Sequence, residues 1–463
     1  MSGGRTRVAP ARSLAFATLR ETFEGDAFAE RAFRDGAERA GLEGRERAQA
    51  QRLAYGAVQR RGTLDAAIER LAGRSTRLLD PPVLAALRLG LYELLFADGT
   101  PDHAAVDQAV ELVKGAGAGH AAGFANAVLR RAARERAELS AALLEDDSGP
   151  EAAAVAHSAP EWLARMWWEQ LGPEPARSLL AAANERAPVA MRVSTLRADR
   201  DAVLTKLRGA GVEAAVPAGE WPLAAPETIA IAGRTGELVP AMVAGGELTP
   251  QSLGSAAVVE VLGPRPGEQV LDLCAGPGIK TGQIAARMGD RGELISVELD
   301  PARAAEVSAQ ASRLGLRSVT AIEADVTAAA ALPGGFDRVL LDAPCSDLGA
   351  LASRPDARWR KSPRTIERLV EVQERALLAA ATALRPGGVL VYSTCTISRR
   401  ENEERVEALL AAAAAGDAPP LELEDLGARA PALASPLEPR CLQVRPDRDR
   451  TTGFFIARLT RND

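Results

Sequence analysis

Two cysteines stand where their thiols could do chemistry together. Cys345 lies in the run Asp-Ala-Pro-Cys-Ser, and Cys395 lies in the run Tyr-Ser-Thr-Cys-Thr. Each follows an apolar, strand-like segment, at 338–341 and 389–392 respectively. Ligands bind at the carboxyl ends of the strands in a parallel sheet, so both thiols are expected at a ligand-binding edge. The pair predicts covalent catalysis by a nucleophilic thiol and a second, assisting thiol.

A glycine-containing turn follows another strand-like segment, 269–273. Glycines in such a turn allow the backbone to approach a ligand closely. Glu298 ends the next strand, 20 positions after the second glycine, where a carboxylate can accept both ribose hydroxyls of a nucleoside. Asp325 follows the third strand and is expected near the adenine. The turn residues predicted to bind the cofactor are Cys274, Ala275, Gly276, Pro277, Gly278, Ile279 and Lys280.

Three nucleotide chemistries compete for this turn. A dinucleotide fingerprint requires a third glycine where Thr281 stands. A phosphate-binding P-loop requires glycine directly before the lysine, but Ile279 precedes Lys280. With Asp272 before the turn and Glu298 after it, S-adenosylmethionine fits better than either. The alternative is a tight turn with a structural role only.

The elements that must position these residues indicate a multidomain protein. Residues 1–140 are expected to form an all-α bundle, and 141–244 a small α+β region after a polar linker at 140–150. Residues 245–463 alternate strands and helices, which predicts an α/β, Rossmann-like, mostly parallel sheet. The strands are expected at 269–273, 293–298, 318–323, 337–342, 388–393 and 454–459, the helices at 280–288, 301–314, 364–385 and 401–414, and a surface connection at 411–420.

The composition is that of a globular protein. Of the 463 residues, 47% are hydrophobic and 25% are charged, with a net charge of −6. No apolar run reaches the length that spans a membrane, and no apolar core follows the basic N-terminal residues as in a signal peptide. The four scattered cysteines form neither a disulfide framework nor a zinc motif. We therefore expect a cytoplasmic protein without a metal.

Three motifs together resemble the Sun/RsmB family of RNA cytosine-C5 methyltransferases. They are the glycine turn, Asp-Ala-Pro-Cys-Ser at 342–346 and Ser-Thr-Cys-Thr at 393–396. The family's turn usually reads Cys-Ala-Ala-Pro-Gly-Gly-Lys-Thr, so Gly276 and Ile279 depart from it. Ser252 stands where the family usually has aspartate. The segments 87–94, 103–106 and 123–130 are similar to the NusB-like helical domain, which marks the branch that modifies small-subunit rRNA.

The resemblance implies a role for each motif residue. Cys395 would be the nucleophile that adds to C6 of cytosine, and Cys345 would assist release or proton removal. Asp342 would contact the N3/N4 edge of the base and lie near the cofactor. DNA cytosine methyltransferases use the Pro-Cys thiol as nucleophile instead, but there Glu-Asn-Val follows the cysteine, and here Ser-Asp-Leu follows. Cys274 and Cys441 are interpreted as packing residues.

The expected partner is RNA, namely 16S rRNA, and the enzyme is expected to be monomeric. Basic residues follow the Cys345 loop closely and predict contacts with RNA phosphates. They are Arg354, Arg358, Arg360 and Lys361. The alternative is that this run of charges is only a solvated face. Two other functions remain open from the sequence. One is methylation of tRNA by the same chemistry, and the other is a non-catalytic, NusB-like RNA-binding or antitermination factor.

Overall fold

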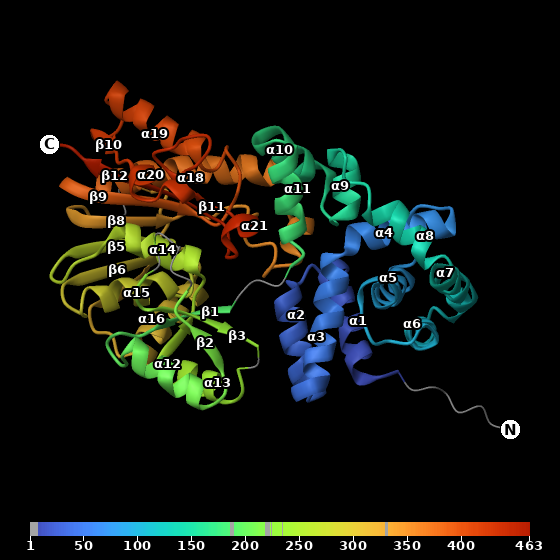
Figure 1. Ribbon diagram of the computed structural model, residues 1–463. Helices are drawn as coiled ribbons and strands as arrows, with labels where there is room; N and C mark the ends of the chain where they lie inside the picture. The colour runs from blue at the N-terminus through green and yellow to red at the C-terminus, as the bar shows by residue number, and fades with distance from the viewer. Residues whose placement is uncertain (1–7, 186–188, 218–222, 224, 234, 329–331) are drawn as a thin grey trace. The chain divides into compact units, whose positions relative to one another are not determined.

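The computed structural model describes residues 8–185, 189–217, 223, 225–233, 235–328 and 332–463, which Figure 1 draws as ribbon. They divide into two compact units. The first unit is Met1–Glu185 together with Leu351–Arg360, and the second is Arg186–Ala350 together with Lys361–Asp463. No helix within the described ranges combines the length and apolar character needed to cross a membrane.

The first unit is helical and builds its core from the apolar faces of its helices. Pro81 and Pro82 begin the central helix α5 (Pro81–Phe96), whose residues are buried along most of its length. The other helices are α1 (Pro10–Phe23), α2 (Ala29–Ala40), α3 (Gly44–Gln59), α4 (Arg61–Ala72), α6 (Asp102–Gly115), α7 (Ala122–Arg134), α8 (Arg136–Leu144), α9 (Pro150–Ala156), α10 (Glu161–Leu171) and α11 (Pro173–Ala182). Helices α1, α3, α4, α6 and α7 all pack against α5.

A short segment from the other half of the chain belongs to this helical unit. This segment is Leu351–Arg360, which contains the helical turn α17 (Ala357–Arg360). The indole N–H of Trp359 donates to the carbonyl of Val58 at 2.8 Å. The carboxylate of Asp356 accepts from the backbone N–H of Ala29 at 3.3 Å. The chain therefore leaves the second unit at Ala350 and returns to it at Lys361.

The second unit contains a small antiparallel sheet. Its strands are β1 (Val189–Val193), β2 (Glu213–Ala215), β3 (Thr228–Ala232) and β4 (Leu248–Pro250), in the order β2-β3-β1-β4. Helices α12 (Arg200–Gly209) and α13 (Leu238–Ala244) pack against it around an apolar core. Arg287 joins this sheet to the main sheet of the unit, because its guanidinium pairs with Glu227 and Glu260.

The main sheet of the second unit is mixed, in the order β10-β12-β9-β8-β5-β6-β7, with β11 paired to β12. Strands β5 to β9 are parallel, and β12 closes the sheet antiparallel to β9. Chain order reverses between β5 and β8, which makes this the switch point where α/β sheets bind ligands. The strands are β5 (Gln269–Leu273), β6 (Glu293–Glu298), β7 (Val319–Glu323), β8 (Phe336–Asp342), β9 (Leu384–Thr394), β10 (Leu421–Leu423), β11 (Leu442–Val444) and β12 (Phe454–Arg461).

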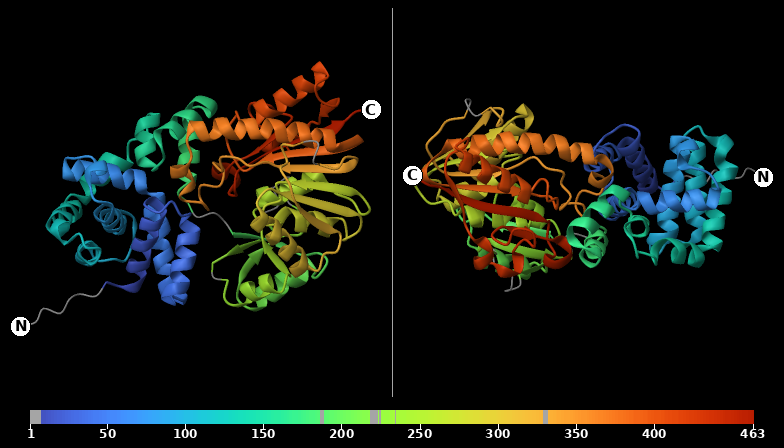
Figure 2. Two further views of the ribbon diagram at one scale, coloured as in Figure 1. Left: turned by 180° about the vertical axis from the view of Figure 1, so that it is seen from behind. Right: turned by 90° about the horizontal axis from the view of Figure 1, so that it is seen from above.

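Helices cover both faces of the main sheet. On one face α14 (Leu253–Leu262) and α15 (Ile279–Arg287) bury alternate strand residues such as Val270 and Leu340. On the other face α18 (Pro363–Ala383) and α19 (Glu403–Ala415) bury the intervening ones, including Leu271 and Leu341. Figure 2 shows the long α18 lying along the sheet. The remaining helices are α16 (Pro301–Leu314), α20 (Leu426–Arg429) and α21 (Pro446–Asp449).

The predicted fold class is confirmed, but two predicted connections are wrong in part. Residues 140–144 belong to α8, because this helix packs against α4 instead of ending at the polar residues. Residues 411–415 continue α19, which ends where Gly416 adopts a left-handed conformation. The domain boundaries at 140 and 244 stay predictions. The compact units divide at Glu185 because α9 packs against both α4 and α8.

Candidate active site

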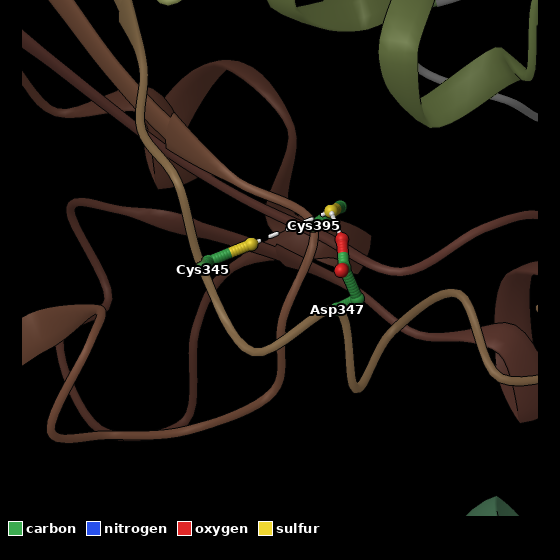
Figure 3. A group of neighbouring side chains, drawn as sticks. All are labelled: Cys345, Asp347 and Cys395. Atoms are coloured by element: carbon green, nitrogen blue, oxygen red, sulfur yellow. Dashed lines mark hydrogen bonds between the residues drawn. The ribbon is translucent and has the colours of Figure 1, made fainter. Parts of the chain in front are cut away.

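Strands β8 and β9 bring the two predicted thiols together. The strands are parallel neighbours with Asp342 opposite Ser393, so their following loops leave the same edge of the sheet. The Sγ atoms of Cys345 and Cys395 lie 3.4 Å apart, as Figure 3 shows. All four cysteines of the chain are free thiols. The fold therefore places the two predicted catalytic cysteines in direct contact.

The Cys395 thiol is held in its protonated form by its surroundings. Its pKa is raised well above the ordinary value, first by the hydrogen bond with Cys345 and next by burial. The negative charges of Asp347 and Asp342 raise the pKa further. A thiol in such a place needs an acceptor for its proton when it acts as a nucleophile.

Asp347 is a site residue that sequence reasoning missed. Its Oδ1 accepts a hydrogen bond from the Cys395 thiol at 3.1 Å, and Figure 3 shows the carboxylate beside that sulfur. The two sulfur atoms and a carboxylate oxygen of Asp347, which could together hold a metal ion, lie within 4.8 Å of one another. The only sequence signal was its position two residues after Cys345. The absence of a metal stays a prediction.

A buried network fixes the loop that carries Cys345. The Glu401 carboxylate accepts from the backbone N–H of Ser346 at 2.8 Å and from its hydroxyl at 2.5 Å. Gln373 donates to the carbonyl of Pro344 at 2.9 Å and also to Glu401. Burial raises the pKa of Glu401, although its hydrogen bonds with Ser346 oppose the shift. These hydrogen bonds tie the loop to Glu401 and to Gln373 of α18.

The predicted cofactor turn has the conformation that its glycines favour. Gly276 and Gly278 have positive φ values of 58° and 83°, and so does Cys274 at 60°. Among the described residues, and apart from the two chain neighbours of Gly276, no heavy atom lies within 4 Å of a Cβ built on it, so the turn faces open space there. The Glu298 carboxylate accepts from the backbone N–H of Gly276 at 2.9 Å and of Leu299 at 3.0 Å. This ties the end of β6 to the turn after β5.

The other predicted cofactor residues lie around this turn in different ways. Ile279 begins α15, and the exposed Asp325 caps its own turn by accepting from Thr327. The hydrogen bonds with Thr327 lower the pKa of Asp325. Below the turn, the buried Asp272 accepts from the Thr281 hydroxyl at 2.6 Å, and burial raises its pKa to about 7.

Asp342 connects the predicted cofactor turn with the strand end that precedes Cys395. Its Oδ2 pairs with Nζ of Lys280 at 2.5 Å, and its Oδ1 accepts from the Ser393 hydroxyl at 2.7 Å. The Lys280 ammonium also lies 5.0 Å from the centre of the Phe454 ring. Both carboxylate oxygens are thus engaged, which fixes the carboxylate in one orientation.

The structure separates the four basic residues predicted to contact RNA. Arg358 is completely buried in the helical unit, and its guanidinium donates to the carbonyls of Ser158 and Ala183 and to the side chain of Asn184. The prediction that Arg358 contacts RNA is therefore wrong. Burial lowers the pKa of Arg358 to about 9.

The other three basic residues differ in their surroundings. Arg360 pairs with Asp26 at 2.6 Å and with Asp356 at 2.7 Å, and only 17% of its side chain is exposed. Arg354 is exposed. Lys361 lies in the second unit, with Nζ 3.6 Å from Oδ2 of Asp347. Contacts of these three residues with RNA stay predictions.

Three family descriptions match successive parts of the chain. Residues 9–134 match the NusB family. Residues 159–224 match the ferredoxin-like domain of RsmF/B-like methyltransferases. Residues 259–460, which contain both thiols and the cofactor turn, match the description 16S rRNA methyltransferase RsmB/F.

Relatives match this chain over most of its length. A probable ribosomal RNA small subunit methyltransferase B from Synechocystis sp. is 33% identical and covers 97% of this chain and 99% of its own length. A protein of the same description from Bacillus subtilis is 33% identical over 88% of this chain and 89% of its own. The crystal structure of PH0851 has a TM-score of 0.80 at 25% identity, covering 98% of this chain and 99% of that chain.

Proposed function

Because this chain belongs to the RsmB/F family of 16S rRNA methyltransferases, we propose that it methylates C5 of one cytosine in 16S rRNA through a covalent bond to Cys395. The observation that carries this proposal is the contact of 3.4 Å between the sulfur atoms of Cys345 and Cys395. One thiol can bond to the base while the other lies close enough to assist its release. The proposal also includes a monomeric, cytoplasmic enzyme.

Cytosine C5 is a weak nucleophile, and this sets what the protein must supply. Addition of the Cys395 sulfur to C6 moves electron density onto C5. C5 then bonds to the methyl group of the donor, and removal of the C5 proton with loss of the sulfur restores the aromatic ring. The face of the base must be reachable, so the cytosine has to be unstacked or single-stranded. We assign Cys345 to the release stage because its thiol is in contact with Cys395.

Asp342 is assigned to the N3/N4 edge of the cytosine. Lys280 and Ser393 each engage one of its oxygens and hold the carboxylate in place. A carboxylate oxygen can accept more than one hydrogen bond, so these contacts leave acceptor positions for the base. A carboxylate held in this way can accept a hydrogen bond from the N4 amino group and so orient the base.

The residues around the glycine turn fit S-adenosylmethionine. The turn faces open space at Gly276, and the oxygens of Glu298 keep acceptor positions for ribose hydroxyls beyond the backbone bonds they make. Asp325 lies after β7, the position assigned to adenine contact. When bound, S-adenosylmethionine supplies a methyl group on a positively charged sulfur.

The test uses two single variants and the RNA product. In Cys345→Ala, a protein–RNA adduct that resists denaturation and maps to Cys395 is expected to accumulate. In Cys395→Ala, neither adduct nor 5-methylcytosine is expected, and continued methylation would refute the nucleophile assignment. Bisulfite sequencing of rRNA and tRNA from a deletion strain identifies the substrate. Loss of one 16S signal supports the proposal, whereas loss of a tRNA signal alone favours a tRNA methyltransferase.

A further inference from the structure

Asp347 occupies a position in the Cys345 loop that the backbone makes difficult for a residue with a side chain. Its φ is +61°, in the left-handed region that glycine adopts most readily. Aspartate is tolerated there, but strained positions of this kind persist mainly where function uses them. The outlier therefore prompts the question of what the carboxylate does.

The surroundings of Asp347 aim its carboxylate at the reactive sulfur. Oδ1 lies 3.1 Å from Sγ of Cys395, and Oδ2 lies 3.6 Å from Nζ of Lys361. Lys361 also donates to the carbonyl of Cys345 at 3.5 Å, so it holds Cys345 and Asp347 together. The backbone N–H of Gly349 donates to the carbonyl of Cys395 at 2.9 Å, which holds the Cys345 loop against Cys395.

The following inference rests on the proposed function. We propose that Asp347 is a further catalytic residue, which accepts the proton of the Cys395 thiol as the sulfur bonds to C6 of the cytosine. The S–H bond breaks, its electron pair forms the S–C6 bond, and the proton moves to Oδ1 of Asp347. The π pair between C5 and C6 moves onto C5. After C5 has taken the methyl group, the C5 proton is lost to solvent and its bonding pair restores the C5–C6 π bond. The S–C6 electron pair returns to sulfur, which takes back the proton held by Asp347. No oxidant or reductant is consumed.

The other groups near Cys395 are less suited to this transfer. Asp342 is assigned to the edge of the base, whereas the carboxylate that accepts a hydrogen bond from the Cys395 thiol is that of Asp347. Cys345 is assigned to the release stage. Burial and the hydrogen bond with Cys345 raise the pKa of Cys395 and favour the thiol, so attack on the base needs an acceptor for its proton. A carboxylate that already accepts the thiol hydrogen bond meets that need without rearrangement.

The experiment separates attack on RNA from simple thiol reactivity. Cys345→Ala and the double variant Cys345→Ala/Asp347→Asn are each mixed with RNA and S-adenosylmethionine, and the rate of Cys395 adduct formation is measured. Asparagine tolerates the left-handed conformation, so the change removes the proton acceptor and keeps the backbone. In parallel, the rate of Cys395 alkylation by iodoacetamide is measured by peptide mass spectrometry.

We expect adduct formation to slow by about 100-fold, within the range of general-base catalysis, while alkylation does not slow. Alkylation uses the equilibrium thiolate, which removal of a neighbouring negative charge favours. An adduct rate within about twofold of Cys345→Ala would overturn the inference. Equal slowing of both reactions would also overturn it, because Asp347 would then only position the thiol. Asp417→Asn, an exposed site, is the matched control.

The outcome also distinguishes failure of this inference from failure of the proposed function. If Cys345→Ala with Asp347 intact forms no adduct at all, the covalent mechanism itself is wrong and the role of Asp347 fails with it. If that variant forms the adduct and the double variant forms it equally fast, the mechanism stands and only the proton acceptor is misassigned.

Discussion

Ser393 donates a 2.7 Å hydrogen bond to the carboxylate of Asp342 across the paired ends of β9 and β8. The two residues are direct partners in the parallel register, and Ser393 is completely buried. Lys280 holds the other oxygen of the same carboxylate. A hydroxyl on one strand, an ammonium from the cofactor turn and a carboxylate on the neighbouring strand thus form one unit.

Ser393→Ala tests this unit. The change removes the hydroxyl donor from one oxygen of the partly exposed Asp342, and the loss of such a hydrogen bond costs about 1 kcal/mol. We expect methylation to slow about tenfold and the free energy of unfolding to fall by about 1 kcal/mol. Turnover and urea unfolding measure the two effects. Ser308→Ala, at an exposed position on α16, should change neither. Full activity in Ser393→Ala would show that the hydrogen bond does not position Asp342.

Glu298→Gln tests the cofactor turn. The glutamine amide would direct its NH₂ group at a backbone N–H of Gly276 or Leu299, where the carboxylate now accepts hydrogen bonds. Loss of a hydrogen bond to a charged group is worth about 1.5–3 kcal/mol, so affinity for S-adenosylhomocysteine should fall at least about tenfold. Calorimetry measures it. Glu293→Gln, exposed at the start of β6, is the control. Unchanged affinity would remove Glu298 from the cofactor site.

Asp272→Asn tests the pH dependence of stability. Burial raises the pKa of Asp272 to about 7, above the ordinary value of 3.8. Between these values the folded state binds more protons than the unfolded state, so stability contributed by Asp272 is present at low pH and lost as the pH rises towards 7. The free energy of unfolding of Asp272→Asn minus that of the wild type should rise by up to about 4 kcal/mol between roughly pH 4 and 7.

Urea unfolding of both proteins at several pH values makes this measurement. Asp417→Asn, at an exposed position, should follow the wild-type profile. If the free energies of unfolding of Asp272→Asn and the wild type differ by the same amount from acid to neutral pH, Asp272 titrates alike in the folded and unfolded states.

Arg358→Ala and Arg354→Ala should have different effects. Removal of Arg358 takes away the buried donor that Ser158, Ala183 and Asn184 share, so the melting temperature should fall by several degrees. Arg354 is exposed, and its loss should weaken RNA binding at low salt and reduce the slope of log affinity against log salt by about 1. Circular dichroism and filter binding measure the two effects. A lower salt slope in Arg358→Ala without a loss of stability would contradict the burial of its guanidinium.

Local patterns in the sequence were enough to predict much of the catalytic domain. The strands at 269–273 and 293–298 end where the predicted strands end, because buried parallel strands are short apolar runs bounded by turn residues. Gly278 was predictable because a left-handed residue at the start of α15 favours glycine. The linker at 140–150 could not be predicted so well, because packing against α4 decides where α8 ends.

What the sequence determined by itself is the chemistry that the chain carries: two thiols after strands, a glycine turn and acids placed after it. Only the tertiary structure decided which of these groups meet. The contact between Cys345 and Cys395 crosses 50 residues of sequence, and that between Cys395 and Asp347 crosses 48. Arg358 finds its acceptors up to 200 residues away and becomes buried. Local patterns describe neighbours along the chain, whereas burial and proton transfer depend on partners that only folding brings within a few ångströms.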